Sequence, residues 1–166
     1  MAIEDLGPAE RITAGAVGEP GSRRFYLQIV AGGIPTSLLA EKQQVAALAE
    51  QGLAILIERE ISAEQEAVAR LIAEGLPVED PGEGNERFRV GDISITLGSS
   101  ELLTVEITSA DDADGVTFVI APEQFRAMAQ VALEVVRQGR PLCPWCQLPM
   151  DPDGHACPAR NGHHRD

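Results

Sequence analysis

The sequence predicts an α+β fold, with helices packed on one face of an antiparallel β-sheet, followed by a small metal-binding tail. Strand-like segments occur in two groups, and each group runs directly into an amphipathic segment. All three cysteines and all three histidines lie between Cys143 and the C-terminus. Runs of hairpin strands followed by helices are typical of α+β layering. We therefore expect an α+β domain over residues 1–139 and a zinc-knuckle tail over residues 140–166.

Length and charge restrict the classes of protein to consider. A chain of 166 residues fits one domain with an appendage. The net charge of −13 would repel nucleic acid and anionic membrane surfaces, so neither is an expected partner. No stretch has the length and apolarity of a membrane span or a signal peptide. Three cysteines, an odd number, make a poor disulfide framework, which favours the cytoplasm.

The first group of strands follows a segment, residues 1–11, that we interpret as a polar lead-in. Alternating apolar side chains predict strands over residues 11–17, 23–30 and 34–40. Gly32-Gly33 and the Gly- and Pro-containing segment 18–22 predict the intervening turns. Arg23-Arg24 could grip an anion, but alternation along a strand predicts that at least one of the two is an ordinary solvent-facing charge.

A helix is predicted from Glu41, because Val45, Leu48, Gly52 and Leu56 form one stripe at helical spacing. Gly52 on this stripe indicates close packing against a neighbouring element. A second helix is predicted after it, since Ser62 and Gln65 have the spacing of a capping box; its expected end is Gly75 and a loop follows.

The second group of strands covers residues 88–97, 103–107 and 116–120. Within the first of them the apolar parity switches at Gly91-Asp92, which predicts a bulge or tight turn. Pro122 then stands at an expected first helical position, and this last helix is predicted to end at Gly139.

The two groups share an order of three strands and a helix. Aligning residues 36–43 with 117–124 pairs Thr36 with Thr117, Ala40 with Ala121 and Gln43 with Gln124. These identities fit either two duplicated β-β-β-α halves or convergent strand-to-helix sequences, and the architecture follows in both cases.

The candidate metal ligands lie in the tail. Cys143 and Cys146 have the spacing with which a tight turn aims two thiolates at one ion. Residues 151–154 have the composition of a type I turn that would return the chain toward them. Cys157 and a histidine then complete a zinc site. His155, His163 and His164 could each supply the nitrogen, and we favour His155, with His163 as the second choice.

Two other kinds of chemistry use the same types of residue. Cys143-Pro-Trp-Cys146 has the form of a redox dithiol, but that chemistry usually places the pair at the start of a helix, whereas here it follows one. A catalytic zinc needs an open position and a nearby acid or base. Asp151 and Asp153 are close in sequence, yet their turn roles account for them. The pattern favours structural zinc and assigns no catalytic residue.

Three segments carry a resemblance to a known family: AGAVGEPGSRRFYLQ (14–28), EKQQVAALAE (41–50) and GRPLCPWCQLPMDPDGHACPARNGH (139–163). They resemble an uncharacterised actinobacterial family with a zinc-ribbon-like tail, the domain of unknown function 3090. Where that family commonly has glycine after its second cysteine, this chain has Gln147. Members are typically encoded beside a phosphoglycerate-mutase-like histidine phosphatase and a kinase-like protein, so the resemblance implies a functional association with both.

The functional prediction is a zinc-binding protein that acts as a non-enzymatic adaptor or regulatory module and binds a protein partner or a small ligand. The alternative is a metal- or thiol-dependent enzyme acting on a phosphorylated or thiol metabolite. The number of protein ligands on the metal distinguishes the two, because four ligands close the ion to substrate and three leave a position open.

Overall fold

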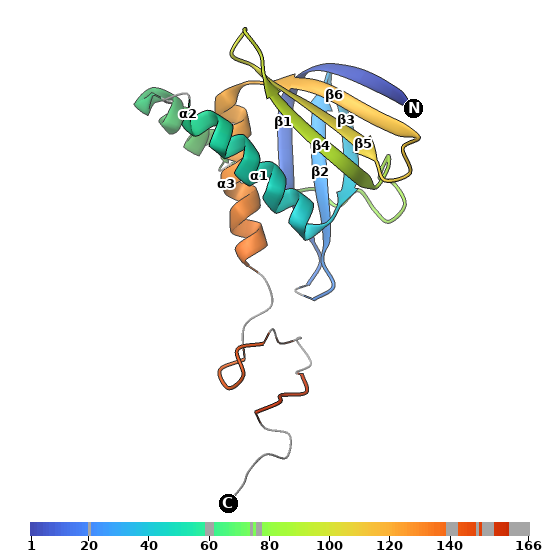
Figure 1. Cartoon of the computed structure of the whole chain (residues 1–166), viewed down its shortest axis with the longest axis vertical. Coiled ribbons are helices and arrows are strands. Elements are labelled where there is room, and N and C mark those ends of the chain that lie inside the picture. The colour runs from blue at the N-terminus through green and yellow to red at the C-terminus, as the bar shows by residue number, and fades with distance from the viewer. Residues whose placement is uncertain are drawn as a thin grey trace, which may run out of the picture.

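The structure is a computed structural model and describes residues 1–19, 21–58, 62–73, 75, 78–138, 143–148, 150 and 155–159. It confirms the mixed α+β fold, with the helices gathered on one side of the strands (Figure 1). The elements are, in order, β1 (Ala2–Val17), β2 (Arg24–Ala31), β3 (Ile34–Ala40), α1 (Lys42–Ile57), α2 (Ala63–Ala73), β4 (Val90–Leu97), β5 (Leu103–Ser109), β6 (Asp114–Ile120) and α3 (Pro122–Arg137). The predicted helix end at Gly139 lies outside the described residues.

The local signals in the sequence explain most of these boundaries. At the start of α2, the Ser62 N–H donates to Gln65 Oε1 and the Gln65 N–H donates to Ser62 Oγ, as expected for a capping box. Pro122 occupies the first turn of α3, where a missing N–H costs nothing. The expected bulge in β4 appears as a register shift between Val90 and Ile93.

The strands form one sheet in the order β3-β2-β1-β6-β5-β4. Neighbouring strands are antiparallel except β1 and β6, which run parallel. The interpretation of residues 1–11 as a lead-in is wrong, because Ala2–Pro8 pairs with β6 as part of β1. These residues are largely exposed and their partner lies far along the chain, so they show no alternation by which a strand could be recognised.

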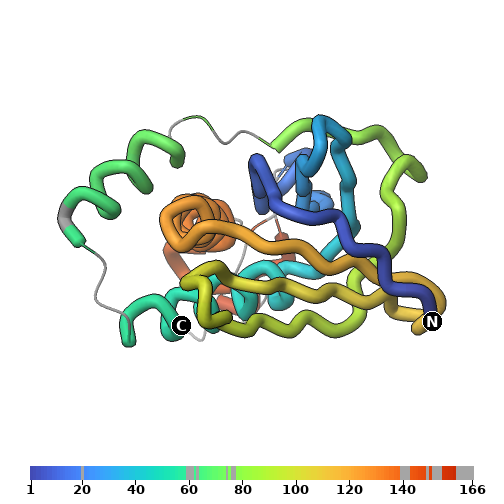
Figure 2. Tube along the Cα trace, turned by 90° about the horizontal axis from the view of Figure 1, so that it is seen from above, coloured from blue at the N-terminus to red at the C-terminus, as the bar shows by residue number. Residues whose placement is uncertain are grey.

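The two edges of the sheet meet. The segment before β4 runs parallel to β3, where the Leu39 N–H donates to the Phe88 carbonyl at 3.0 Å and the Arg87 N–H donates to the Ser37 carbonyl at 2.8 Å. The sheet therefore curls around on itself, as the view from above shows (Figure 2). Helices α1 and α3 pack against each other, α3 also packs on β1 and α1 on β4.

The two halves of the fold repeat the same details. Pro8 of β1 pairs in parallel with Val119 of β6, and Arg89 before β4 pairs in parallel with Leu39 of β3. Each first strand has its register shift directly after this point, following Ala9 in β1 and following Val90 in β4. A match in pairing direction and in bulge position goes beyond shared strand-to-helix order, and it supports two duplicated β-β-β-α halves.

The helices fix the register of this repeat. N-cap residue Glu41 of α1 corresponds to N-cap residue Ala121 of α3. The sequence alignment that pairs Ala40 with Ala121 is therefore out of register by one residue. In the correct register the buried residues of α1 match buried residues of α3, the pairs being Val45/Phe125, Leu48/Met128, Ala49/Ala129 and Gly52/Ala132.

The corrected register also makes Gln44 the equivalent of Gln124. Gln44 Nε2 donates to the carbonyls of Val90 and Gly91, both at 3.0 Å, and Gln124 Nε2 donates to the carbonyl of Glu10 at 2.9 Å. Both glutamines thus bind the bulged part of the first strand that belongs to the opposite half. Each half contributes a helix that satisfies backbone groups of the other.

Arg87, in the segment before β4, links that segment to β1 and β6. Its guanidinium donates two bonds of 2.9 Å to Asp114 and one to Glu4, and the bonds to Asp114 raise the pKa of Arg87 above its ordinary value. The same contact holds the pKa of Asp114 below its ordinary 3.8. A bidentate pair of this kind is stronger than a single surface contact.

We expect Arg87→Gln to lower the free energy of unfolding most near neutral pH. A depressed carboxylate pKa contributes stability that is present above the unfolded-state pKa of about 3.9 and is lost as pH falls through the lower, folded-state value. The difference between wild type and variant should therefore shrink in acid, as measured by urea unfolding across the pH range. Arg70→Gln, at an exposed position of α2, is the matched control. A difference that stays constant with pH would contradict the assignment.

Candidate metal centre

The tail between Cys143 and Leu148 folds into a tight knuckle. The Cys143 N–H donates to the Leu148 carbonyl at 2.8 Å, and the Gln147 N–H donates to the Cys143 carbonyl at 2.9 Å. The Trp145 N–H points at Cys143 Sγ from 3.5 Å. These bonds fix the backbone of the knuckle, so that the thiols of Cys143 and Cys146 can bind the same ion.

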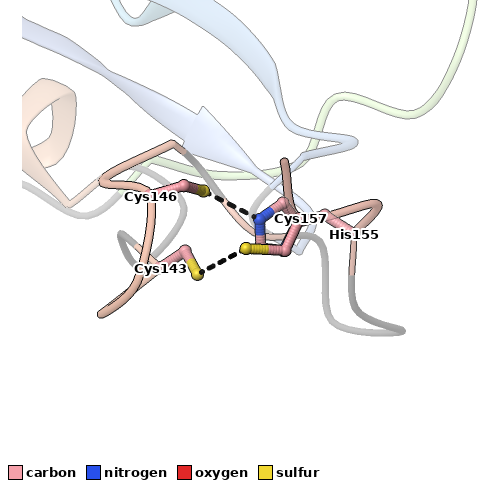
Figure 3. Close-up of side chains that lie close together, drawn as sticks. All are labelled: Cys143, Cys146, His155 and Cys157. Carbon is pink, nitrogen blue, oxygen red and sulfur yellow. Dashed lines mark hydrogen bonds between the residues drawn. The ribbon is translucent and has the colours of Figure 1, made fainter. Parts of the chain in front are cut away.

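The second part of the centre comes from His155 and Cys157 (Figure 3). Cys157 Sγ lies 3.8 Å from Cys143 Sγ, and His155 Nε2 lies 3.3 Å from Cys146 Sγ. All four ligand atoms lie within 4.8 Å of one another. Cys143 and Cys157 are buried, at 2% and 5% exposure, while Cys146 and His155 are half-buried. The cysteines are free thiols.

The spacing of the donors fits a tetrahedral ion. Ligands about 2.3 Å from a tetrahedral zinc are about 3.8 Å from one another, which is the separation of Cys143 Sγ and Cys157 Sγ. Three thiolates and one imidazole are a common donor set for zinc. Sulfur and nitrogen donors suit soft or borderline metals and disfavour calcium and magnesium, which take oxygen ligands. These four residues could therefore hold a transition-metal ion with all four positions supplied by the protein.

The thiols of the knuckle are not equivalent. Burial raises the pKa of Cys143, but the N–H groups of Cys146 and Trp145 stabilise its thiolate, and its pKa lies below the ordinary 9.0. The Leu148 N–H lowers the pKa of Cys146, yet burial and the neighbouring Cys157 and Cys143 thiols raise it above the ordinary value. The Trp145 N–H that points at Cys143 Sγ favours the thiolate of Cys143, the form that binds metal.

Sequence reasoning named these four residues, and the structure brings them together. The predicted turn at residues 151–154 and the alternative ligand His163 lie outside the described residues. Gln147 adopts φ +64°, in the left-handed region that favours glycine. This is the position after the second cysteine, where the resembling family commonly has glycine. The N–H···S bond to Cys143 was not predicted, although a residue two positions after the first cysteine of a CxxC turn is the place to expect it. Among the described residues, no other group of metal-binding side chains forms.

Comparison with known protein families identifies the family of this chain. The family described as "Protein of unknown function (DUF3090)" matches residues 5–157. The chain belongs to the DUF3090 family. The DUF3090 match begins within β1 and ends at Cys157, so it includes the sheet except the first residues of β1, the helices and all four residues of the cluster.

Comparison of this DUF3090 chain with curated proteins and with solved structures finds no match. In the described part of the chain, no helix combines the length and the apolar character that a membrane span requires.

Proposed function

We propose that this DUF3090 protein is a zinc protein in which Cys143, Cys146, His155 and Cys157 hold a structural ion, and that it acts as a non-enzymatic adaptor or regulatory module. The convergence of four protein donors carries the proposal, because a closed shell leaves no position for substrate or a reactive water. Free thiols suit a reducing compartment, which supports a cytoplasmic location.

The proposed role of the zinc is to hold a contact surface. Trp145 and Leu148 belong to the knuckle and are 62% and 49% exposed. Exposed tryptophan and leucine side chains on a rigid turn are suited to a protein partner, since tryptophan is enriched among the residues that dominate binding energy. The partners that we propose are the histidine-phosphatase-like and kinase-like proteins implied by the family resemblance.

Zinc-edge X-ray absorption on untagged protein, with metal analysis, tests this function against the enzyme alternative. The expected result is zinc in a shell of three sulfurs and one nitrogen. A water or other non-protein ligand in the shell would reject the closed site and favour an enzyme acting through the metal. If the folded protein binds no metal and its thiols are reactive, both the structural zinc site and the metal-dependent enzyme are rejected. Thiol chemistry is then favoured.

Gln147→Gly is expected to tighten metal binding. A non-glycine residue in the left-handed region carries a penalty of about 1–2 kcal/mol, which glycine removes from the knuckle. Competition with a chromophoric chelator should show roughly five-fold or greater tightening, in proportion to that energy. Gln147→Ala is the control, because alanine keeps the penalty while removing the side chain. Equal gains in both variants would show that the side chain, and not the backbone, limits affinity.

A further inference from the structure

A basic cavity lies at the N-terminal end of α1, in the α+β body. It has a volume of about 250 Å³, and its lining includes Arg23, Arg24, Lys42 and Arg89. Four of the chain's 13 basic residues thus surround one small space in a protein of net charge −13. Glu41 is the acidic residue of this lining.

Arg23 and Arg24 both line this space, and the Arg24 side chain is partly exposed, in keeping with the expectation that at least one of the two faces solvent. Strand β2 begins at Arg24, so Arg23 directly precedes it. Arg23 donates to the carbonyls of Val135 and Gln138 at the end of α3, at 3.4 and 3.1 Å. These bonds hold the guanidinium in place by satisfying carbonyls that the helix leaves open.

The positive charge of the cavity is only partly neutralised. Arg89 forms an ion pair with Glu41 at 2.6 Å. Arg24 lies 4.0 Å from both Asp80 and Glu83, beyond hydrogen-bond distance, and exposed pairs of this kind contribute little. The N-terminus of the sixteen-residue helix α1 lies at the same place, where Glu41 and Gln44 form a capping box.

We propose that this cavity binds the phosphoryl group of a small phosphate monoester. A phosphoryl dianion offers several acceptor oxygens, and guanidinium groups match them with paired donors, whereas a carboxylate would use fewer of the groups present. Typical pockets for drug-sized ligands measure about 300–1,000 Å³, so a cavity of about 250 Å³ fits a small metabolite better than a nucleotide. None of the four basic residues belongs to the Cys/His cluster, so the proposal does not depend on the metal.

Calorimetric titration of the full-length, metal-containing protein tests this site. The probes are inorganic phosphate and methyl phosphate, with acetate and chloride at matched ionic strength as comparisons. Saturable binding of both phosphates is expected, with methyl phosphate at least as tight as phosphate and both tighter than acetate or chloride. Binding of phosphate without methyl phosphate would overturn the assignment to a monoester, and equal binding of chloride would reduce the site to general charge attraction.

Two variants locate the binding. Arg24→Gln and Lys42→Gln each remove one charge, and each should weaken phosphate binding roughly ten-fold, as expected for a charge-assisted hydrogen bond. Lys42 is exposed and Arg24 half-buried in a loose ion pair, so both variants are expected to keep the wild-type melting temperature. Arg70→Gln removes the same charge at an exposed position of α2 and should leave binding unchanged. Equal weakening in all three variants would overturn the site.

Discussion

Cys143→Ser is expected to abolish metal binding by the tail. Zinc binding to small structural sites releases about 10–16 kcal/mol at neutral pH, and this energy requires a complete set of deprotonated ligands. A serine hydroxyl stays protonated and is a poor ligand for zinc, so the variant keeps three donors and loses the buried thiolate that the N–H groups of the knuckle support. Metal analysis after dialysis against a mild chelator should show zinc in wild type and almost none in the variant.

The controls for this prediction separate the ligands from their neighbours. Cys157→Ser and His155→Ala should also lose zinc, because their donor atoms complete the same cluster. His163→Ala should retain it, since His155 supplies the nitrogen in the proposed site. Loss of zinc from the His163 variant, with retention in the His155 variant, would reverse the assignment of the fourth ligand.

The same variants test the proposed division of the chain. If residues 1–139 form a domain of their own, the main unfolding transition of Cys143→Ser should match that of wild type, because the core lies in the sheet and the helices before the tail. A clear fall in melting temperature on loss of the metal would instead place tail and body in one cooperative unit.

Gly52→Ala should destabilise the fold by about 1–3 kcal/mol, the usual cost of overpacking a core. Alanine is the better helix former by about 1 kcal/mol, so helix propensity alone predicts the opposite sign. A Cβ atom at position 52 would lie 1.9 Å from Cε1 of Phe125, whose ring is fully buried between the helices and the sheet. The helices α1 and α3 must therefore separate or the ring must move.

A second substitution can relieve this clash. The equivalent positions in the other half hold Ala132 and Val45, an alanine and a valine in place of Gly52 and Phe125. We therefore expect Gly52→Ala with Phe125→Val to be more stable than the sum of the two single changes predicts, with a coupling within the range of about 0.5–3 kcal/mol found for residues in contact. Denaturant unfolding followed by circular dichroism measures the cycle.

The exposed neighbour Gln51→Ala controls for helix propensity and should have little effect. Strict additivity of Gly52→Ala and Phe125→Val would show that the ring adjusts without cost. The close approach of the two helices would then contribute little to stability.

Sequence patterns were most informative where a segment is regular and half-buried. Phe25, Leu27 and Ile29 marked the strand at Arg24–Ala31, and Gly52 on the helix stripe indicated close packing, which the structure shows against Phe125. Such patterns depend on local periodicity, which a single sequence displays.

Features set by distant partners were not predictable in the same way. Ala2–Pro8 forms a strand because β6 supplies its hydrogen bonds, and nothing in its own exposed residues indicates this. The alignment of the two halves was wrong by one residue because it matched identical residue types. The structural repeat instead matches buried positions with buried positions, and it makes Phe125 the equivalent of Val45. In the tail, residue types predicted the donors, but the left-handed Gln147 and the thiol bond to Trp145 needed coordinates.

The crossed glutamine contacts have a consequence for how this architecture can be assembled. Gln44 and Gln124 each serve the strand of the opposite half, so one β-β-β-α half alone lacks the partner that its helix and its first strand require. Two copies of a half could exchange these contacts about a twofold axis. Fusion of two half-length copies would produce this arrangement of contacts. Cutting the connection between α1 and β4 should accordingly yield two fragments that bind each other, which co-purification from a mixed expression would reveal.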